Sequence, residues 1–245
     1  MATWDKTDII HFLSDLYGYS SYLELCTPTT GGLYHRIDRS RFKTCHRLMY
    51  RCPVSFSDGM DINFRSPDLR TADLLATVYA LGLRYDIVLV DSFHTHETSY
   101  RDMADALGVL ADTGTIIVHD CLPPSENLVS PDWAPGDWCG VSFVAYVDFL
   151  NDHPDLAYAT VDADYGCGIV RKGAARPTVP SEIANGWSAA RRNSKAAFRF
   201  MVENKDYLLN LMSVDDFKAA ERRRARDGEI TASKERIRPP AVAAF

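Results

Sequence analysis

The stretch Tyr85–Pro124, YDIVLVDSFHTHETSYRDMADALGVLADTGTIIVHDCLPP, decides the fold. Its first part, Tyr85–Asp91, is a short apolar run rich in branched residues, which predicts a strand buried on both faces. Residues 97–110 carry apolar side chains at helical spacing, residues 112–114 predict a turn, and Thr115–Asp120 predicts a second buried strand. Because a strand, a helix and a strand in this order form a right-handed crossover, the two strands should be parallel. The stretch therefore predicts an α/β fold.

The flanking sequence continues this alternation of strands and helices. Helices are expected over residues 5–17, from Ser66-Pro67 to about 83, and over 141–151, and strands over 22–26, 44–50, 60–64, 156–161 and 168–171, the last two forming a hairpin. From residue 174 the sequence becomes charged and helical, and Ser213–Asp216 forms a possible capping box for a helix that runs to about Asp227. We therefore expect one domain over residues 1–173 and a helical C-terminal extension over 174–245.

The composition excludes several classes of protein. The chain of 245 residues is 46% hydrophobic and 24% charged, as is usual for a globular protein with a large core. Its net charge of −6 argues against general nucleic-acid binding, and no apolar run reaches the ~20 residues that span a bilayer. The start of the chain lacks the features of a signal peptide, and the six cysteines form no Cys-x-x-Cys pair. We expect a reduced, cytoplasmic protein.

Polar side chains follow both strands of the deciding stretch. Asp91 and His94 come at the end of the first strand, and His119 and Asp120 come at the end of the second. Ligands of a parallel α/β sheet bind outside the carboxyl ends of its strands, and neighbouring strands lie about 4.8 Å apart. These four side chains should therefore face one shared site.

The chemistry of this set leaves three alternatives open. His94 or His119 could act as a general base, because an unperturbed imidazole titrates near pH 6.5. The same histidines together with Asp91 and Asp120 could instead hold a metal ion, and a mixed set of this kind suits Zn, Fe or Mn better than Mg. The third alternative is a hydrogen-bonded structural cluster, in which Asp91 caps the following helix.

The deciding stretch resembles the fourth strand, helix and fifth strand of class I S-adenosylmethionine (SAM)-dependent methyltransferases. It is most similar to the subgroup with Asp-Gly-x-His-x-Tyr after strand four and His-Asp after strand five, although Ser92 replaces the glycine and His96 the tyrosine. The similarity covers roughly residues 5–172 and includes Tyr22–Leu25 as the first strand. It implies a three-layer Rossmann-like methyltransferase fold, with a mostly parallel seven-stranded sheet that ends in an antiparallel hairpin.

The resemblance also implies a function and a set of site residues. It implies methyl transfer from SAM to a small-molecule acceptor, at an oxygen atom. The residues along the cofactor would be Glu24, Gly31, Gly32, Asp68 and Asp91, and those facing the acceptor would be His94, His119 and Asp120. Some methyltransferases hold a divalent metal that acidifies the acceptor hydroxyl, and Asp91, His94, His119 and Asp120 are the candidate ligands for Mg, Mn, Zn or Fe. The C-terminal helices could pack on the domain or form a homo-oligomer.

The loop after the first strand supports two rival hypotheses. The family has glycines where this chain has Cys26, Pro28 and Thr30, and bases at 46–51 replace the acid that ends the second strand in the family. The first rival is a cofactor-free, metal-dependent hydrolase, isomerase or oxygenase on the same scaffold, because a fold does not fix a function. The second is a non-catalytic binding protein. A convergent His/Asp set favours an enzyme over this second rival.

Overall fold

The computed structural model describes residues 4–27, 33, 36–50, 62–66, 78, 80–91, 93–173 and 176–237, and for residues 50, 62–66 and 229–237 it describes the backbone alone. The helices are α1 (Lys6–Tyr17), α3 (His96–Val109), α4 (Ser142–Asp152), α5 (Ser181–Ala190), α6 (Ser194–Glu203), α7 (Lys205–Leu208) and α8 (Val214–Ile237), with 3-10 turns at Arg39–Arg41 and Glu126–Leu128. The strands are β1 (Ser21–Cys26), β2 (Thr44–Tyr50), β3 (Ile62–Ser66), β4 (Tyr85–Asp91), β5 (Leu110–Val118), β6 (Leu156–Val161), β7 (Cys167–Lys172) and β8 (Leu211–Met212). None of the described helices is long and apolar enough to span a membrane.

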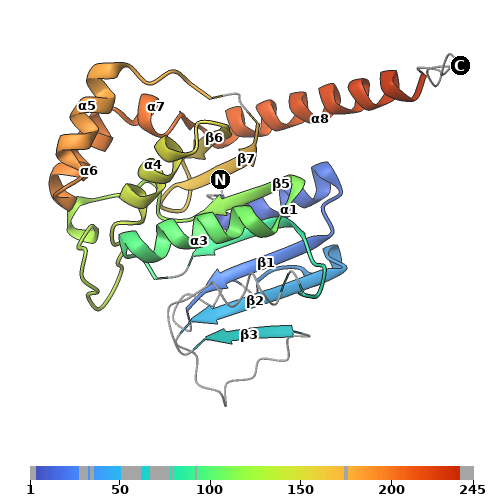
Figure 1. Cartoon of the computed structure of the whole chain (residues 1–245), viewed down its shortest axis with the longest axis horizontal. Coiled ribbons are helices and arrows are strands. Elements are labelled where there is room, and N and C mark those ends of the chain that lie inside the picture. The colour runs from blue at the N-terminus through green and yellow to red at the C-terminus, as the bar shows by residue number, and fades with distance from the viewer. Residues whose placement is uncertain are drawn as a thin grey trace, which may run out of the picture.

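One mixed sheet forms the centre of the molecule (Figure 1). Its strand order is β3-β2-β1-β4-β5-β7-β6-β8. The strands from β3 to β5 are parallel, and β7 runs antiparallel to both of its neighbours, β5 and β6. The predicted seven strands and the closing hairpin are confirmed. The eighth strand, β8, was not predicted, because its two residues, which pair with β6, are too few to show a periodicity.

Helices cover both faces of the sheet, which confirms the three-layer architecture. Figure 1 shows α3 in front of the sheet and α1 behind it. The α1 face buries Ile9, Leu13, Ile87 and Ile117, together with Phe217 from α8. The opposite face packs against side chains of α3 and α4, among them Met103, Tyr146 and Phe149. Alternate residues of each central strand thus enter different layers, as the pleat requires.

The start of α1 is fixed by local interactions. The carboxylate of Asp5 accepts hydrogen bonds from the backbone N–H groups of Thr7 and Asp8, and the Asp8 side chain accepts from the Asp5 N–H. This capping box satisfies donors that the first turn leaves unpaired. The helix ends at Gly18, whose φ of 66° closes the last turn. Cap and apolar face together hold Lys6, the first residue of α1, at one place against the sheet.

One predicted turn is wrong. Residues 112–114 lie inside β5, which begins at Leu110, directly after α3. The pairing with β4 is irregular here, because Tyr85 pairs with Leu110 whereas Ile87 pairs with Thr115. The turn-forming residues are therefore accommodated as an irregularity in an extended strand. The predicted helix that starts at Ser66-Pro67 lies mostly outside the described residues, although Val78 and Ala80 are helical.

The C-terminal segment packs against both faces of the sheet. Trp187 of α5 and Met201 of α6 join the core on the α3–α4 side. On the α1 side, Glu221 of α8 forms a buried ion pair with Arg171 of β7, with Nη1 and Oε1 2.8 Å apart. The described part of α8 beyond this pair projects away from the sheet (Figure 1).

Candidate active site

The four side chains predicted from the strand ends lie together. Asp91 is the last residue of β4, and His94 follows it in the loop before α3. His119 and Asp120 directly follow β5, the parallel neighbour of β4. All four are buried, with exposed fractions of 4%, 9%, 7% and 3%, respectively. The predicted convergence at one edge of the sheet is therefore present.

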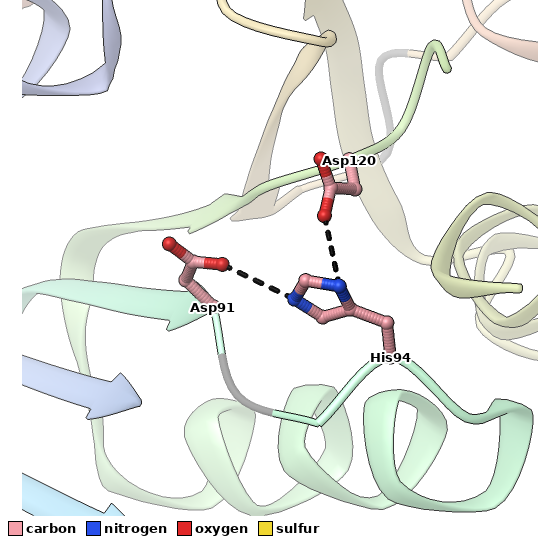
Figure 2. A group of neighbouring side chains, drawn as sticks. All are labelled: Asp91, His94 and Asp120. Carbon is pink, nitrogen blue, oxygen red and sulfur yellow. Dashed lines mark hydrogen bonds and ion pairs between the residues drawn. The ribbon is translucent and has the colours of Figure 1, made fainter. Parts of the chain in front are cut away.

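The His94 ring lies between two carboxylates (Figure 2). Its Nε2 is 3.4 Å from Oδ1 of Asp91, and its Nδ1 is 3.1 Å from Oδ2 of Asp120. The Nδ1–H also lies 2.8 Å from the carbonyl oxygen of Trp138, which can only accept. Burial lowers the pKa of His94, but the hydrogen bond with Asp91 and the charge of Asp120 outweigh it and raise the pKa above its usual value.

The long loop after β5 holds this histidine in place. The indole ring of Trp138 stacks on the His94 ring at a centroid distance of 5.4 Å. A Cβ atom on Gly140 would come 2.0 Å from the His94 carbonyl oxygen, so only glycine fits there. That carbonyl accepts a hydrogen bond from the Val141 N–H at 2.8 Å. This loop, which joins β5 to α4, thus supports the site. Its other tryptophan, Trp133, is 60% exposed.

His119 is surrounded by carboxylates. Its Nδ1 lies 3.3 Å from Oδ1 of Asp91 and 3.3 Å from Oδ1 of Asp120, and its Nε2 lies 3.4 Å from Oδ2 of Asp164. Burial lowers the pKa of His119, but Asp91 and Asp120 raise it well above its usual value. These carboxylates therefore favour the protonated form of His119.

The pKa of Asp91 shows the reverse balance. Burial alone would raise it, but the charges of His119 and Lys6 hold it well below its usual range. Asp91 is thus an ionised carboxylate in a nearly water-free setting. It is also the register partner of Cys26, the last residue of β1.

Two residues of this cluster were missed by the sequence analysis, Lys6 and Asp164. The Lys6 ammonium lies 3.2 Å from Oδ2 of Asp91, 3.5 Å from Oδ2 of Asp164 and 3.1 Å from Nε2 of His119. Nothing in the sequence distinguishes Lys6 from an exposed lysine at a helix start. Asp164 offers a weak signal, because it lies in the acidic turn Asp162–Gly166 of the predicted hairpin.

The turn that carries Asp164 has an unusual backbone. Asp164, Tyr165 and Gly166 all have positive φ, at 49°, 60° and 83°. The carbonyls of Tyr165 and Gly166 accept hydrogen bonds from the N–H groups of Leu122 and Cys121, at 2.8 and 3.0 Å. These two hydrogen bonds tie the turn to the segment after Asp120. Residues other than glycine rarely adopt a positive φ, so Asp164 and Tyr165 mark a constrained backbone.

The predicted cofactor residues are only partly described. Gly31, Gly32 and Asp68 lie outside the described residues. Glu24 is fully buried in β1, and its Oε2 accepts a hydrogen bond of 2.9 Å from the Tyr22 hydroxyl. Burial, with a further contribution from the charge of Asp91, raises the pKa of Glu24 to about 7. Glu24 therefore lies inside the sheet layer rather than at its edge.

The site offers a set of possible metal ligands. Asp91, His94 and Asp120 each contribute one ligand atom, and these atoms lie within 4.8 Å of one another. His119 is not part of this group. His96, the first residue of α3, points to α4 instead, where its Nε2 lies 2.8 Å from Oδ2 of Asp148.

The cluster lies beside the point where the order of strands reverses. β1 has β2 on one side and β4 on the other. The chain therefore continues from β1 to β2 and β3 toward one edge of the sheet, and then crosses to β4 and β5 on the other side of β1. In open α/β sheets, this switch point leaves a crevice at the carboxyl edge in which ligands bind. Asp91 and Cys26, at the ends of β4 and β1, flank it.

Comparison with known proteins gives a match at the level of structure. No family model and no curated protein matches the sequence. A provisionally assigned caffeoyl-CoA O-methyltransferase from Staphylococcus aureus aligns with a TM-score of 0.51 and 13% identity, over 71% of this chain and 85% of its own. The SAH-bound methyltransferase PaMTH1 from Podospora anserina aligns with a TM-score of 0.47 and 17% identity, over 70% and 80%. The SAM-bound O-methyltransferase TomG from Streptomyces achromogenes gives 0.47 and 15%, over 71% and 82%. The strand order and the alignment with the Staphylococcus aureus protein show that the chain has the fold of the class I SAM-dependent methyltransferases.

Proposed function

We propose that this protein is a SAM-dependent methyltransferase that methylates a hydroxyl oxygen of a small molecule. The observation that carries the proposal is the buried cluster of Asp91, His94, His119 and Asp120 beside the switch point of the sheet. A charged cluster of this kind is costly to bury, and such clusters are concentrated at functional sites.

The position of Asp91 fits a SAM site. Its ionised carboxylate ends β4 beside the switch point, and an anion there suits a positively charged sulfonium compound. Bound SAM would supply an electrophilic methyl group. Asp91 would contact it, together with Gly31, Gly32 and Asp68, whereas Glu24 would support the first loop from within the sheet.

The residues of the chain would orient the acceptor and take up its proton. His94 is the general base of this proposal: in its neutral form the Nδ1–H is held by the Trp138 carbonyl, and Nε2, which faces Asp91, takes up the proton. Asp91 and Asp120 then stabilise the imidazolium ion that forms. His119 keeps its proton and holds both carboxylates in position. Alignment of the two reactants would supply most of the remaining rate.

The second candidate function is that of a metal-dependent enzyme, and the ligand set of Asp91, His94 and Asp120 favours it. This donor set fits a divalent ion such as Zn, Fe or Mn. A bound ion would acidify a hydroxyl group or a water molecule. It could assist methyl transfer, or serve another reaction without SAM.

A transfer assay separates these candidates. The protein is incubated with SAM and a set of phenols, alcohols and hydroxy acids, and the formation of S-adenosylhomocysteine (SAH) is measured by mass spectrometry. We expect SAH formation with at least one acceptor, and a loss of roughly 10²–10⁴-fold in His94→Gln, because the proton acceptor is removed. His153→Gln, at the end of α4, is the matched control and should leave the rate unchanged. An unimpaired His94→Gln variant would remove His94 as the base.

A further inference from the structure

The Lys6 ammonium is the most unusual feature of the site. It comes from the first turn of α1, which is far in sequence from the strand ends that were predicted to form the site. Only 14% of its side chain is exposed. It contacts three parts of the fold, namely Asp91 at the end of β4, His119 after β5 and Asp164 in the β6–β7 turn.

Lys6 and Asp164 are both held in place by the backbone around them. The capping box at Asp5 fixes the first turn of α1. The backbone N–H of Lys6 also donates to Oδ2 of Asp164 at 3.2 Å, so helix start and turn are joined by two interactions. The positive φ angles of Asp164 and Tyr165 and the link to Leu122 then determine where this carboxylate lies. The ammonium is therefore built into the site rather than a flexible surface charge.

Lys6 and the possible metal site share one carboxylate. Asp91 offers Oδ1 toward His94 and Oδ2 toward Lys6, at 3.4 and 3.2 Å. A divalent ion held by Asp91, His94 and Asp120 would lie beside the ammonium and draw on the same negative charge. Two cations that share one carboxylate repel each other strongly where water is largely excluded.

We propose that Lys6 is the resident cation of this site and that Lys6 and a divalent metal ion exclude one another. The ammonium provides the positive charge that balances Asp91 and Asp164. A metal ion can bind Asp91, His94 and Asp120 only if the Lys6 side chain leaves the site. The native chain is thus adapted to work without a divalent ion, and its ligand set becomes available when Lys6 is removed.

Manganese binding tests this exclusion. The affinity of the full-length protein for Mn²⁺, added as MnCl₂, is measured by the loss of the free-ion electron paramagnetic resonance signal. We expect Lys6→Met to bind Mn²⁺ on the order of a hundredfold more tightly than the native chain, because the competing charge is gone. Lys6→Arg, which keeps the charge, should bind as weakly as the native chain. Lys195→Met removes a lysine that is 63% exposed and is the control for net charge.

The location of the bound ion is tested by a second substitution. Adding Asp91→Asn to Lys6→Met should abolish the gain in affinity, because the shared ligand is lost. Lys6→Gln gives the same reading if Lys6→Met does not fold. The proposal is overturned if the native chain binds Mn²⁺ as tightly as Lys6→Met, if neither binds it, or if the gain survives Asp91→Asn. Since only metal binding is measured, these outcomes leave the question of methyl transfer separate.

Discussion

Single residues of the sheet show how strongly burial controls charge in this protein. Glu24 and Asp91 are both buried on the α1 face of neighbouring strands. Asp91 stays ionised because two cations face it, whereas Glu24 has a tyrosine hydroxyl as its hydrogen-bond partner and its pKa rises to about 7. Two buried carboxylates on neighbouring strands thus have pKa values shifted in opposite directions.

The raised pKa of Glu24 predicts a pH-dependent stability. Its pKa rises from 4.5 to about 7 on folding, so its contribution is fully present below pH 4.5 and is lost as the pH rises through 7. This loss should lower the free energy of unfolding by about 3 kcal/mol over this range. Glu24→Gln should remove that dependence and be the more stable form at pH 8. Urea unfolding at pH 5 and pH 8 measures this.

The control for this prediction is Glu97→Gln, because Glu97 is 86% exposed. It should leave the difference between the two pH values as it is in the native chain. A Glu24→Gln variant that loses as much stability as the native chain between pH 5 and pH 8 would contradict the assignment.

The sequence predicted that four residues of the buried cluster converge, and it missed two others. Asp91, His94, His119 and Asp120 could be found because parallel strands bring their carboxyl ends together. Lys6 and Asp164 reach the site only through the packing of α1 and of the β6–β7 turn, and no local pattern encodes such contacts. The sequence alone therefore could not show that these two charged residues, which resemble exposed ones, are in contact with the site.

At the scale of elements, the β6–β7 turn determines one wall of the site. Gly166 has a φ of 83°, and a Cβ atom there would lie 2.4 Å from the backbone nitrogen of Leu122. The neighbouring Leu122 cannot move without breaking its hydrogen bond to Tyr165. The turn and the segment after β5 therefore form one rigid unit.

Gly166→Ala should destabilise the protein through this contact. The positive φ costs about 1 kcal/mol for alanine, and the backbone clash adds about 2 kcal/mol, giving a total of about 3 kcal/mol. Gly82→Ala is the matched control, since Gly82 has a φ of 66° and open space around it, and should cost about 1 kcal/mol. Chemical denaturation compares the two. Equal losses would show that the clash is relieved and that the turn is not rigid.

Most elements could be read from the sequence, and the exceptions have physical causes. β2 and β4 were predicted with the residues at which they begin and end. For β4 the reason is an apolar, branched run with acids at both ends, which marks a buried strand. The turn at residues 112–114 was wrong because Asp-Thr-Gly favours turns locally, whereas pairing with β4 keeps the chain extended.

At the scale of the whole molecule, one buried ion pair joins the C-terminal helix to the sheet. The guanidinium of Arg171 donates to both oxygens of Glu221, at 2.8 and 2.9 Å, and its Nε donates to Thr115. The Tyr17 hydroxyl donates to the same carboxylate at 2.6 Å. β5, β7, α1 and α8 thus meet at this pair.

Removing one partner of this pair should be costlier than removing both. Arg171→Met leaves the Glu221 carboxylate buried without its counter-ion, and the expected loss is about 3–5 kcal/mol. The double variant Arg171→Met, Glu221→Met should be more stable than Arg171→Met alone, because no charge remains buried. Urea unfolding of the single and double variants forms a double-mutant cycle. Strictly additive losses would mean that the two side chains do not interact.

Calorimetric titration of SAM into the native chain and into Asp91→Asn is the most direct test of the proposed cofactor site. We expect micromolar binding by the native chain and a loss of about tenfold or more in Asp91→Asn, because a carboxylate with charge-assisted contacts is removed. Absence of binding of both SAH and SAM at millimolar concentration would contradict it and would leave the metal-dependent enzyme as the better explanation of the site.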